Sequence, residues 1–307
     1  MSILKRRALY YVRQLARQAL AVNEEPPFRH LYRETRQHDI QAEIARLKAE
    51  ICIATPDNPV LSGYKVFSQV DEDGILQALL ARLPPSRLSR TAIEIGCADG
   101  RENNTHFLLL NGFRACWVDG SAKDIAFIRR ELEMAGESKG RLLAMERFVS
   151  IENISDIVAH CCEFIGVSDP DVFSLDVDGN DLHILTRAIG LFRPKIVCVE
   201  YNGKFPPPTV LAIRYNPSHE WTGDDYQGAS LQAYCSALAD YALICCNISG
   251  ANAFFVHKEY AGAFAAYPPA ALFQPPRSHL RLLASGHTPS LKWLRDSLEG
   301  PHLPQVS

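Results

Sequence analysis

The sequence lacks the patterns that would place it in several common protein classes. Its nine cysteines include no Cys-x-x-Cys pair, which argues against zinc-ribbon and thioredoxin-like proteins. No apolar run is long enough to span a bilayer, and the first residues lack the continuous apolar stretch of a secretory signal. The formal charge of −3 gives no overall signature of nucleic-acid binding. We therefore expect a cytoplasmic protein with reduced cysteines and no transmembrane segment.

The front of the chain is basic and helical in pattern. Residues 1–20 contain five basic side chains and no acidic one. Apolar residues at helical spacing predict helices over 3–22 and about 38–53. We expect residues 1–60 to form a helical extension that packs on the main domain or mediates self-association. A peripheral membrane helix and an Arg-rich transit segment are the alternatives.

From residue 64 onward, β-branched segments alternate with helical patterns. The predicted strands are 92–96, 115–119, 142–148, 172–176, 195–201, 242–246 and 253–256. The predicted helices are 74–83, 104–111, 122–135, 155–165, 182–189 and, near the end of the chain, 291–298. Such alternation with nearly continuous apolar strands indicates an α/β protein whose parallel sheet is covered on both faces.

The last two predicted strands are joined by a short segment that contains Gly250. Their spacing predicts an antiparallel hairpin at one edge of the sheet. We assign residues 61–265 to this main domain. The proline-rich residues 266–307 are expected to form a wrapping tail.

The stretch EIGCADGRENNT, residues 94–105, joins an apolar strand to a polar loop. Gly96 and Gly100 allow a tight turn and a close approach of the backbone to a ligand. The next helix is expected to begin near Asn103 or Asn104. Ligands of open α/β sheets bind beyond the carboxyl ends of such strands. The spacing is not the G-x-G-x-x-G of dinucleotide-binding proteins, because Ala98 stands where such a site needs glycine.

The following strand ends in WVDG, which places Asp119 25 residues (119 − 94) after Glu94. An acid at that strand end accepts hydrogen bonds from a ribose diol. The glycine loop and this acid together predict a site for a ligand that carries an adenosine but no pyrophosphate.

These features resemble class I S-adenosylmethionine-dependent methyltransferases, and several stretches between about 64 and 257 resemble the FkbM-like members. The stretches are SQVDEDGIL (68–76), EIGCADGRENNT (94–105), WVDG (117–120), SLDVDGNDLHIL (174–185), VEYNGKFPP (199–207) and GANAFFV (250–256). The resemblance implies a Rossmann-like, doubly wound, mostly parallel seven-stranded sheet with an antiparallel edge hairpin. It also implies S-adenosylmethionine as the cofactor.

The resemblance further implies which residues bind that cofactor. Asp119 would hold the ribose, Ser150 would lie beside the adenine, and Asp176 would face the methionine end or the reacting centre. The other implied cofactor residues are Glu94, Gly96, Asp99, Gly100, Asn104 and Gly120. Cys97 and Ala98 depart from the glycine or other small residues of many relatives, which affects the expected loop conformation.

A second polar cluster follows the strand that ends at Asp176. Three interpretations of its residues stay open. Asp178, Asn180, Asp181 and His183 fit a helix start with capping side chains. For transfer to a hydroxyl, His183, Asp178 or Glu200 is the candidate base, with Asp176 beside them. Alternatively, oxygen atoms of Asp176, Glu200 and Asn202 would bind Mg²⁺, Mn²⁺ or Ca²⁺, an arrangement that resembles some metal-dependent O-methyltransferases.

Two further segments are candidates for ligand contact. In SQVDEDGIL, Gln69, Asp71 and Asp73 either cover the cofactor or provide the acids that a helix N-terminus favours. The long loop over 215–231 is either a lid or an ordinary packed loop. Its aromatic composition is typical of a surface that stacks on sugar rings; the residues concerned are Tyr201, His219, Trp221 and Tyr226.

The sequence thus predicts a methyltransferase that forms a methyl ether on a glycan or a related small molecule. A non-catalytic Rossmann-like scaffold is one alternative, and a nucleotide-sugar or NAD-linked enzyme is the other. No nucleic-acid substrate is expected, because the core has no basic stripe.

Overall fold

The computed structural model describes residues 27–133, 140–284 and 286–299. Two compact units divide the chain, Met1–Ala45 and Arg46–Ser307, and the sheet and the cavity lie in the second. The predicted helix over 3–22 lies outside the described residues. Helix α2 (Pro27–Ala54) includes the predicted helix over 38–53 but begins earlier, at Pro27. A proline is well tolerated at the first helical position. The residues that follow it are mostly polar, so this part of the helix has no apolar spacing from which it could be predicted.

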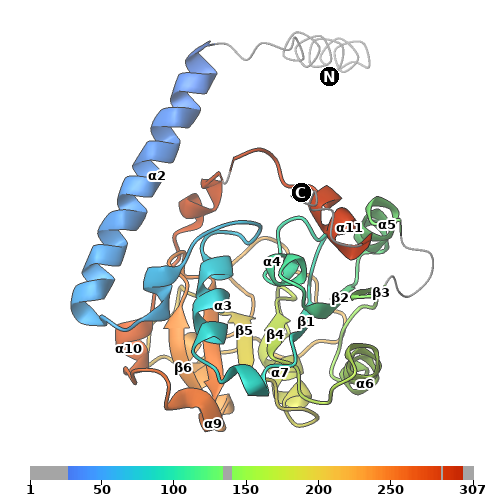
Figure 1. The fold of residues 1–307 in the computed structure, drawn as a ribbon. Coiled ribbons are helices and arrows are strands. Elements are labelled where there is room, and N and C mark those ends of the chain that lie inside the picture. Colours follow the sequence, from blue (N-terminus) through green and yellow to red (C-terminus); the bar gives the residue numbers. More distant parts are fainter. Residues whose placement is uncertain (1–26, 134–139, 285, 300–307) are drawn as a thin grey trace, which may run out of the picture. The chain divides into compact units, whose positions relative to one another are not determined.

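Seven strands form one sheet in the order β3-β2-β1-β4-β5-β7-β6 (Figure 1). The strands are β1 (Thr91–Ile95), β2 (Arg114–Asp119), β3 (Leu142–Glu146), β4 (Val172–Leu175), β5 (Ile196–Glu200), β6 (Tyr241–Cys246) and β7 (Asn252–His257). Only the pairs that include β7 are antiparallel. The predicted fold class, a Rossmann-like, mostly parallel α/β sheet with an edge hairpin, is confirmed.

Helices connect the strands much as the sequence pattern indicates. The predicted helices correspond to α3 (Glu72–Ala81), α4 (His106–Leu110), α5 (Ala122–Glu131), α6 (Ile154–Ile165), α7 (Asp181–Ala188) and α11 (Lys292–Glu299). Three short helices were not predicted, namely α8 (Leu231–Ala237), α9 (Lys258–Ala261) and α10 (Pro269–Leu272). The 3₁₀ turns are η1 (Pro59–Ser62), η2 (Pro85–Arg87) and η3 (Ser278–Leu282). Among the described residues, no helix has the length and hydropathy of a membrane span.

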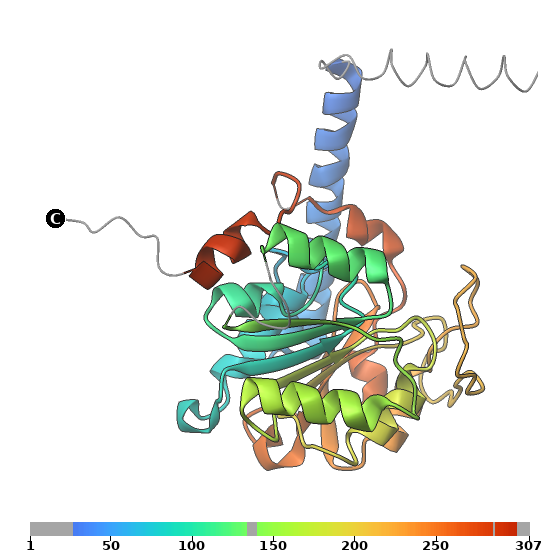
Figure 2. The same cartoon turned by 90° about the vertical axis from the view of Figure 1, so that its right-hand side faces the viewer.

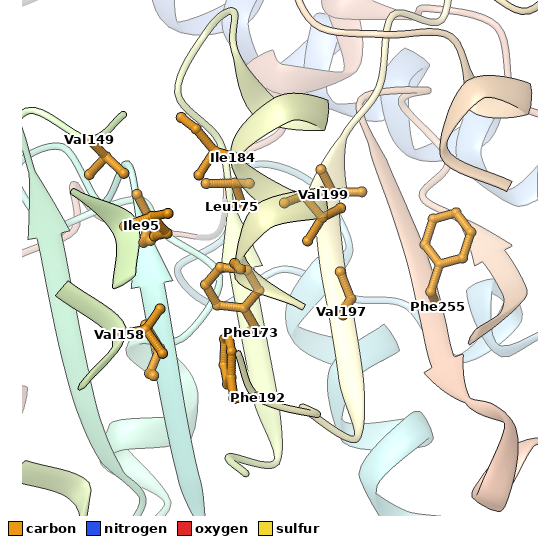
Figure 3. Packing of buried hydrophobic residues seen from close by; sticks show 14 of the residues in the cluster. Ile95, Val149, Val158, Phe173, Leu175, Ile184, Phe192, Val197, Val199 and Phe255 are labelled. Carbon is orange, nitrogen blue, oxygen red and sulfur yellow. The ribbon is translucent and has the colours of Figure 1, made fainter. Parts of the chain in front are cut away.

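Both faces of the sheet are covered, which explains why its central strands are mostly apolar. Figure 2 shows α5 on one face and α6 on the other. Every residue of β1, β4 and β5 is buried. On the α6 side, Ile95, Phe173 and Val197 pack with Val158 and other buried residues in one cluster (Figure 3). Burial of this apolar area fixes the strand order and therefore the position of the strand ends.

The strand order creates a crevice between β1 and β4. The chain proceeds from β1 outward to β2 and β3, and from β4 outward to β5. The connections after β1 and β4 therefore leave in opposite directions. In open α/β sheets, such a reversal point is where ligands bind.

The segment after α10 is held against the β6–β7 turn. Arg277 donates its backbone N–H to the carbonyl oxygen of Ser249 at 2.7 Å and its Nη1 to that of Ile248 at 2.8 Å. The hydroxyl of Tyr201 donates to the carbonyl oxygen of Gln274 at 2.5 Å. A β-carbon on Gly250 would lie 2.3 Å from the carbonyl oxygen of Pro275. These contacts carry η3 to the carboxyl edge of the sheet.

Candidate active site

A cavity of about 530 Å³ opens at the crevice. Its wall is built from the residues that end or follow β1 to β5, together with parts of the long loop and the tail. Of the implied cofactor residues, six line it: Glu94, Gly96, Asn104, Asp119, Gly120 and Asp176. Asp99, Gly100 and Ser150 lie outside this lining.

Gly96 forms the floor of the crevice. Its φ is +85°, and its N–H donates to the carbonyl oxygen of Val118 at 2.8 Å. A β-carbon there would lie 1.5 Å from the carbonyl oxygen of Asp176. Only glycine fits this combination of a left-handed backbone and close contact. The loop after β1 and the end of β4 therefore meet directly beneath the cavity.

Gly100 has a different role from the predicted one. Its φ is +74°, and a β-carbon would lie 2.6 Å from a ring carbon of Trp117. The glycine is needed for packing against β2 and makes no part of the cavity wall. Ala98, which replaces the expected glycine, takes a φ of +46°. Its backbone N–H donates to Oδ2 of Asp119 at 2.8 Å, so the loop keeps a left-handed turn without glycine.

Glu94 is fully engaged in holding the start of α4. Its carboxylate accepts hydrogen bonds from the backbone N–H groups of Asn104 (2.8 Å) and Thr105 (2.9 Å), the Thr105 hydroxyl (2.5 Å) and the Asn103 amide (3.1 Å). Burial raises the pKa of Glu94, and the bonds from Thr105 and Asn104 oppose that rise. Glu94 therefore orders the loop that bounds the cavity.

Asp119 ends β2 and faces the cavity. Its Oδ2 accepts from Ala98 and its Oδ1 from the Ser121 N–H, both at 2.8 Å. Each carboxylate oxygen has a second lone pair, so Asp119 is oriented by the backbone while it keeps acceptor capacity toward the cavity. Beside it, Phe148 is 53% exposed and packs at Gly120. Phe148 lines the cavity where Ser150 was expected.

Three carboxylates from the ends of β4 and β5 meet on the other side of the cavity. Oxygen atoms of Asp176, Asp178 and Glu200 lie within 4.8 Å of one another. Burial, reinforced by the charges of Asp181 and Asp178, raises the pKa of Asp176 to about 8. Burial and the charge of Asp176 likewise raise the pKa of Glu200 well above its ordinary value. Asp178 has a φ of +54°, an uncommon conformation for a non-glycine residue.

Two of the predicted residues in this region point elsewhere. The Nε2 atom of His183 lies 2.9 Å from the carbonyl oxygen of Ile213. The amide of Asn202 donates to the carbonyl oxygens of Asp225 (3.0 Å) and Gln227 (3.1 Å). Neither lines the cavity, because His183 contacts the segment just before the long loop and Asn202 holds the loop itself. His183 is therefore not brought to the carboxylates as a base, nor Asn202 as a metal ligand.

Helix-start contacts account for other polar residues that the sequence marked. Asp181 accepts from the N–H groups of Val177 and Gly179, both at 2.8 Å. Oδ2 of Asp73 accepts three backbone N–H groups in residues 66–68, and Asp71 accepts from the N–H of Ile248. Of the candidates in SQVDEDGIL, Gln69 alone lines the cavity.

The aromatic residues predicted around the long loop do not form one surface. Tyr201 is only 2% exposed and packs inward. Trp221 and Tyr226 are 46% and 53% exposed and lie outside the cavity lining. His219 alone reaches the cavity, where its ring lies so close to Gly179 that a β-carbon there would be 2.1 Å from it.

Polar atoms without a partner gather on the residues that line this cavity. Among the described residues, seven buried side-chain atoms have no hydrogen-bond partner, and four belong to lining residues: Gln69 Oε1, Asn103 Oδ1, Glu200 Oε2 and His219 Nε2. Buried polar atoms are normally paired. Their concentration here indicates a site for a polar ligand.

Sequence reasoning missed Arg281, which reaches the cavity from η3 in the tail. It also missed Asn252 at the start of β7 and Arg147 after β3. No motif marks Arg281 or Arg147, and Asn252 lies in the stretch GANAFFV, for which no site role was expected. Arg281 lies more than 80 residues beyond β5 (281 − 200 = 81), and only the fixing of the tail brings it to the site.

No family model matches the chain, and no curated protein matches it. Among solved structures, the chain is similar to an O-methyltransferase from Bacillus cereus in complex with SAH, at 14% identity and a TM-score of 0.39, over 78% of this chain and 96% of that one. It is also similar to a putative O-methyltransferase from Klebsiella pneumoniae, at 13% identity and a TM-score of 0.37, over 79% and 94%.

A third similar structure is the magnesium protoporphyrin IX methyltransferase from Synechocystis PCC 6803 with bound SAH, at 10% identity and a TM-score of 0.40, over 61% and 82%. Identities and scores this low say nothing about the activity of this chain.

Proposed function

We propose that this chain is an S-adenosylmethionine-dependent methyltransferase that methylates a hydroxyl group. The observation that carries the proposal is the pairing of Asp119 with a cavity whose lining residues hold four unpartnered polar atoms. The opposite wall carries carboxylates, which suit a positively charged sulfonium. The finer resemblance to FkbM-like enzymes stays a prediction.

The lining residues fit the parts of the cofactor in order along the sheet. Phe148, half exposed at the β3 end, offers a flat apolar face for the adenine. Asp119 at the end of β2 offers acceptors to the ribose diol. Gly96 and Asp176, at the reversal point, lie where the sulfur and the amino-acid end would follow. When bound, S-adenosylmethionine supplies a methyl group on positively charged sulfur, and a hydroxyl oxygen displaces that sulfur in line.

The residues at the carboxylate side would align the acceptor and take its proton. Alignment is the larger part of such catalysis. A base must also lie within hydrogen-bond reach of the hydroxyl. We assign that role to Asp178, whose carboxylate lines the cavity while its backbone is held in a left-handed turn. His219, with its unpartnered Nε2, is the second candidate.

A divalent cation is the alternative occupant of the carboxylate cluster. The donor set fits in kind, with Asp178 in place of the predicted Asn202. Such an ion would lower the pKa of a hydroxyl bound to it. However, the Arg281 guanidinium already brings a positive charge to 3.8 Å from Glu200. Chelation with EDTA distinguishes a metal-dependent from a metal-independent reaction. Loss of methyl transfer that is restored by Mg²⁺ or Mn²⁺ would favour the ion. Unchanged transfer would favour acid–base roles alone.

We propose a glycan or a related small molecule as the acceptor. Trp221 and Tyr226 are exposed on the long loop and remain available to a sugar ring. The acidic cavity is unsuited to the phosphates of a nucleic acid.

Transfer of labelled methyl groups tests the proposal. The protein is incubated with methyl-labelled S-adenosylmethionine and extracts of glycans and small metabolites, beside an Asp178→Asn control. We expect label in a base-stable methyl ether with the unsubstituted protein and at least tenfold less with the variant. Cofactor binding without any transfer would support the non-catalytic scaffold instead.

A further inference from the structure

The tail places the guanidinium of Arg281 at the wall of the cavity. Arg281 lies in η3, directly after the segment that Arg277 ties to the β6–β7 turn. Leu280, its neighbour, is fully buried. Both anchors lie within four residues of Arg281, so the position of its backbone is fixed by the core and not by the ligand.

The side chain of Arg281 has donors to spare. Its Nη2 lies 3.8 Å from Oε1 of Glu200, within ion-pair range but too far for a hydrogen bond. Among the described residues, this is the one ion pair that its side chain forms, and its charge also acts at longer range on Asp178 and Asp176. Arg281 is 45% exposed at its side chain, and a guanidinium can donate five hydrogen bonds.

Glu200 offers the opposite charge beside it. Its side chain is 11% exposed, and its Oε2 is buried without a partner. A guanidinium and a carboxyl group therefore stand side by side on the wall of the cavity, each with unused hydrogen-bonding capacity, and a cationic ligand group beside Glu200 would favour its ionised form. Glu200 has therefore lost most of its hydration without gaining a close partner, whereas Arg281 is still partly hydrated.

We propose that Arg281 and Glu200 together bind the zwitterionic amino-acid end of the cofactor, with the α-carboxylate on Arg281 and the α-ammonium on Glu200. The inference rests on the proposed function and assigns the tail to cofactor recognition. An α-amino acid presents charges in the complementary order at similar spacing. A carboxylate also matches the planar fork of a guanidinium, which can bind both oxygens at once.

Titrations with two ligands test this assignment without any acceptor. S-adenosylhomocysteine and 5′-methylthioadenosine share the nucleoside and the thioether, but only the first has the amino-acid end. Both are titrated by calorimetry, in the presence of EDTA, into the unsubstituted protein, Arg281→Gln and Glu200→Gln. Arg147→Gln is the matched control, because Arg147 lines the same cavity at the β3 end.

We expect Arg281→Gln to weaken S-adenosylhomocysteine binding about 10- to 100-fold, the range of a lost charge-assisted contact. Binding of 5′-methylthioadenosine should change by less than about twofold, because this ligand lacks the amino-acid end that Arg281 would contact. Arg147→Gln should change the two affinities by the same factor. Thermal unfolding of each variant establishes that it is folded.

The possible failures are distinct. Equal weakening of both ligands by Arg281→Gln, or no weakening of either, would overturn the assignment of the carboxylate. Unchanged S-adenosylhomocysteine binding in Glu200→Gln would overturn the assignment of the ammonium. If the unsubstituted protein bound neither nucleoside, the proposed function itself would fail.

Discussion

The carbonyl oxygen of Asp176 lies 1.5 Å from the place where a β-carbon on Gly96 would stand. Two strands that are adjacent in the sheet but about 80 residues apart in sequence thus touch through bare backbone (176 − 96 = 80). This contact brings the nucleoside side of the cavity and its carboxylate side within reach of one ligand. It also makes the glycine a stringent requirement.

Replacing Gly96 with alanine should lower the free energy of unfolding by about 3 kcal/mol or more, since the methyl group meets rigid backbone and the φ is left-handed. Gly223→Ala is the control, because that residue has a φ of +86° with no atom within 4 Å of an added β-carbon. Its cost should be only the conformational ~1–2 kcal/mol. Equal losses in urea denaturation would contradict the close contact.

Glu94→Gln should destabilise the protein by about 2–4 kcal/mol, because an amide nitrogen replaces an acceptor among four donors in a buried place. Exposed Glu50, which pairs with Arg46 on α2, provides the control, and Glu50→Gln should cost under about 0.5 kcal/mol. Denaturation midpoints of the two variants give the comparison. A neutral Glu94→Gln would mean that the hydrogen bonds to the start of α4 do not order the loop.

Asp119→Ala should weaken S-adenosylhomocysteine binding about tenfold or more, as expected for loss of hydrogen bonds to a charged acceptor. Asp99→Ala is the matched control. Asp99 lies in the same loop region but pairs with Arg101 outside the cavity. Calorimetry should show full affinity for that variant, and a loss as large as that of Asp119→Ala would contradict the assignment of the ribose.

Acid should destabilise the protein through His106. Burial lowers the pKa of His106 from 6.5 to about 4, and its ring stacks on Phe67 at 3.8 Å. The unfolded chain therefore takes up a proton near pH 6.5, and the folded chain does so only near pH 4. The free energy of unfolding should fall by up to about 1.4 kcal/mol per pH unit across that window.

The variant His106→Gln should remove that part of the slope, while His287→Gln at an exposed position should keep it. Urea denaturation at several pH values between 4 and 7 measures both. An unchanged slope in His106→Gln would mean that folding does not shift the pKa of His106.

The sheet could be predicted from the sequence because its strands are buried on both faces and therefore read as apolar runs. Their alternation with amphipathic helices implied parallel strands, and the gap at Gly250 implied the hairpin. Short helices such as α8 carry too few turns to show a period.

The site was harder to predict because residue type does not reveal direction. Glu94 and Asp73 are acidic residues of the kind that contact ligands, but their carboxylates accept hydrogen bonds from backbone N–H groups instead. His183 follows Asp181 on the helix after β4 yet turns toward the long loop. Arg281 carries no local signal at all, since its position depends on the contacts of the tail with the β6–β7 turn.

The central claim is that the cavity receives an adenosine-bearing sulfonium or thioether ligand. Its most direct test is calorimetric titration of the unsubstituted protein with S-adenosylhomocysteine, repeated with saturating NAD. The claim predicts binding of one equivalent with an affinity that NAD leaves unchanged. Absence of binding, or displacement by NAD, would contradict it and would favour a scaffold or a dinucleotide enzyme, respectively.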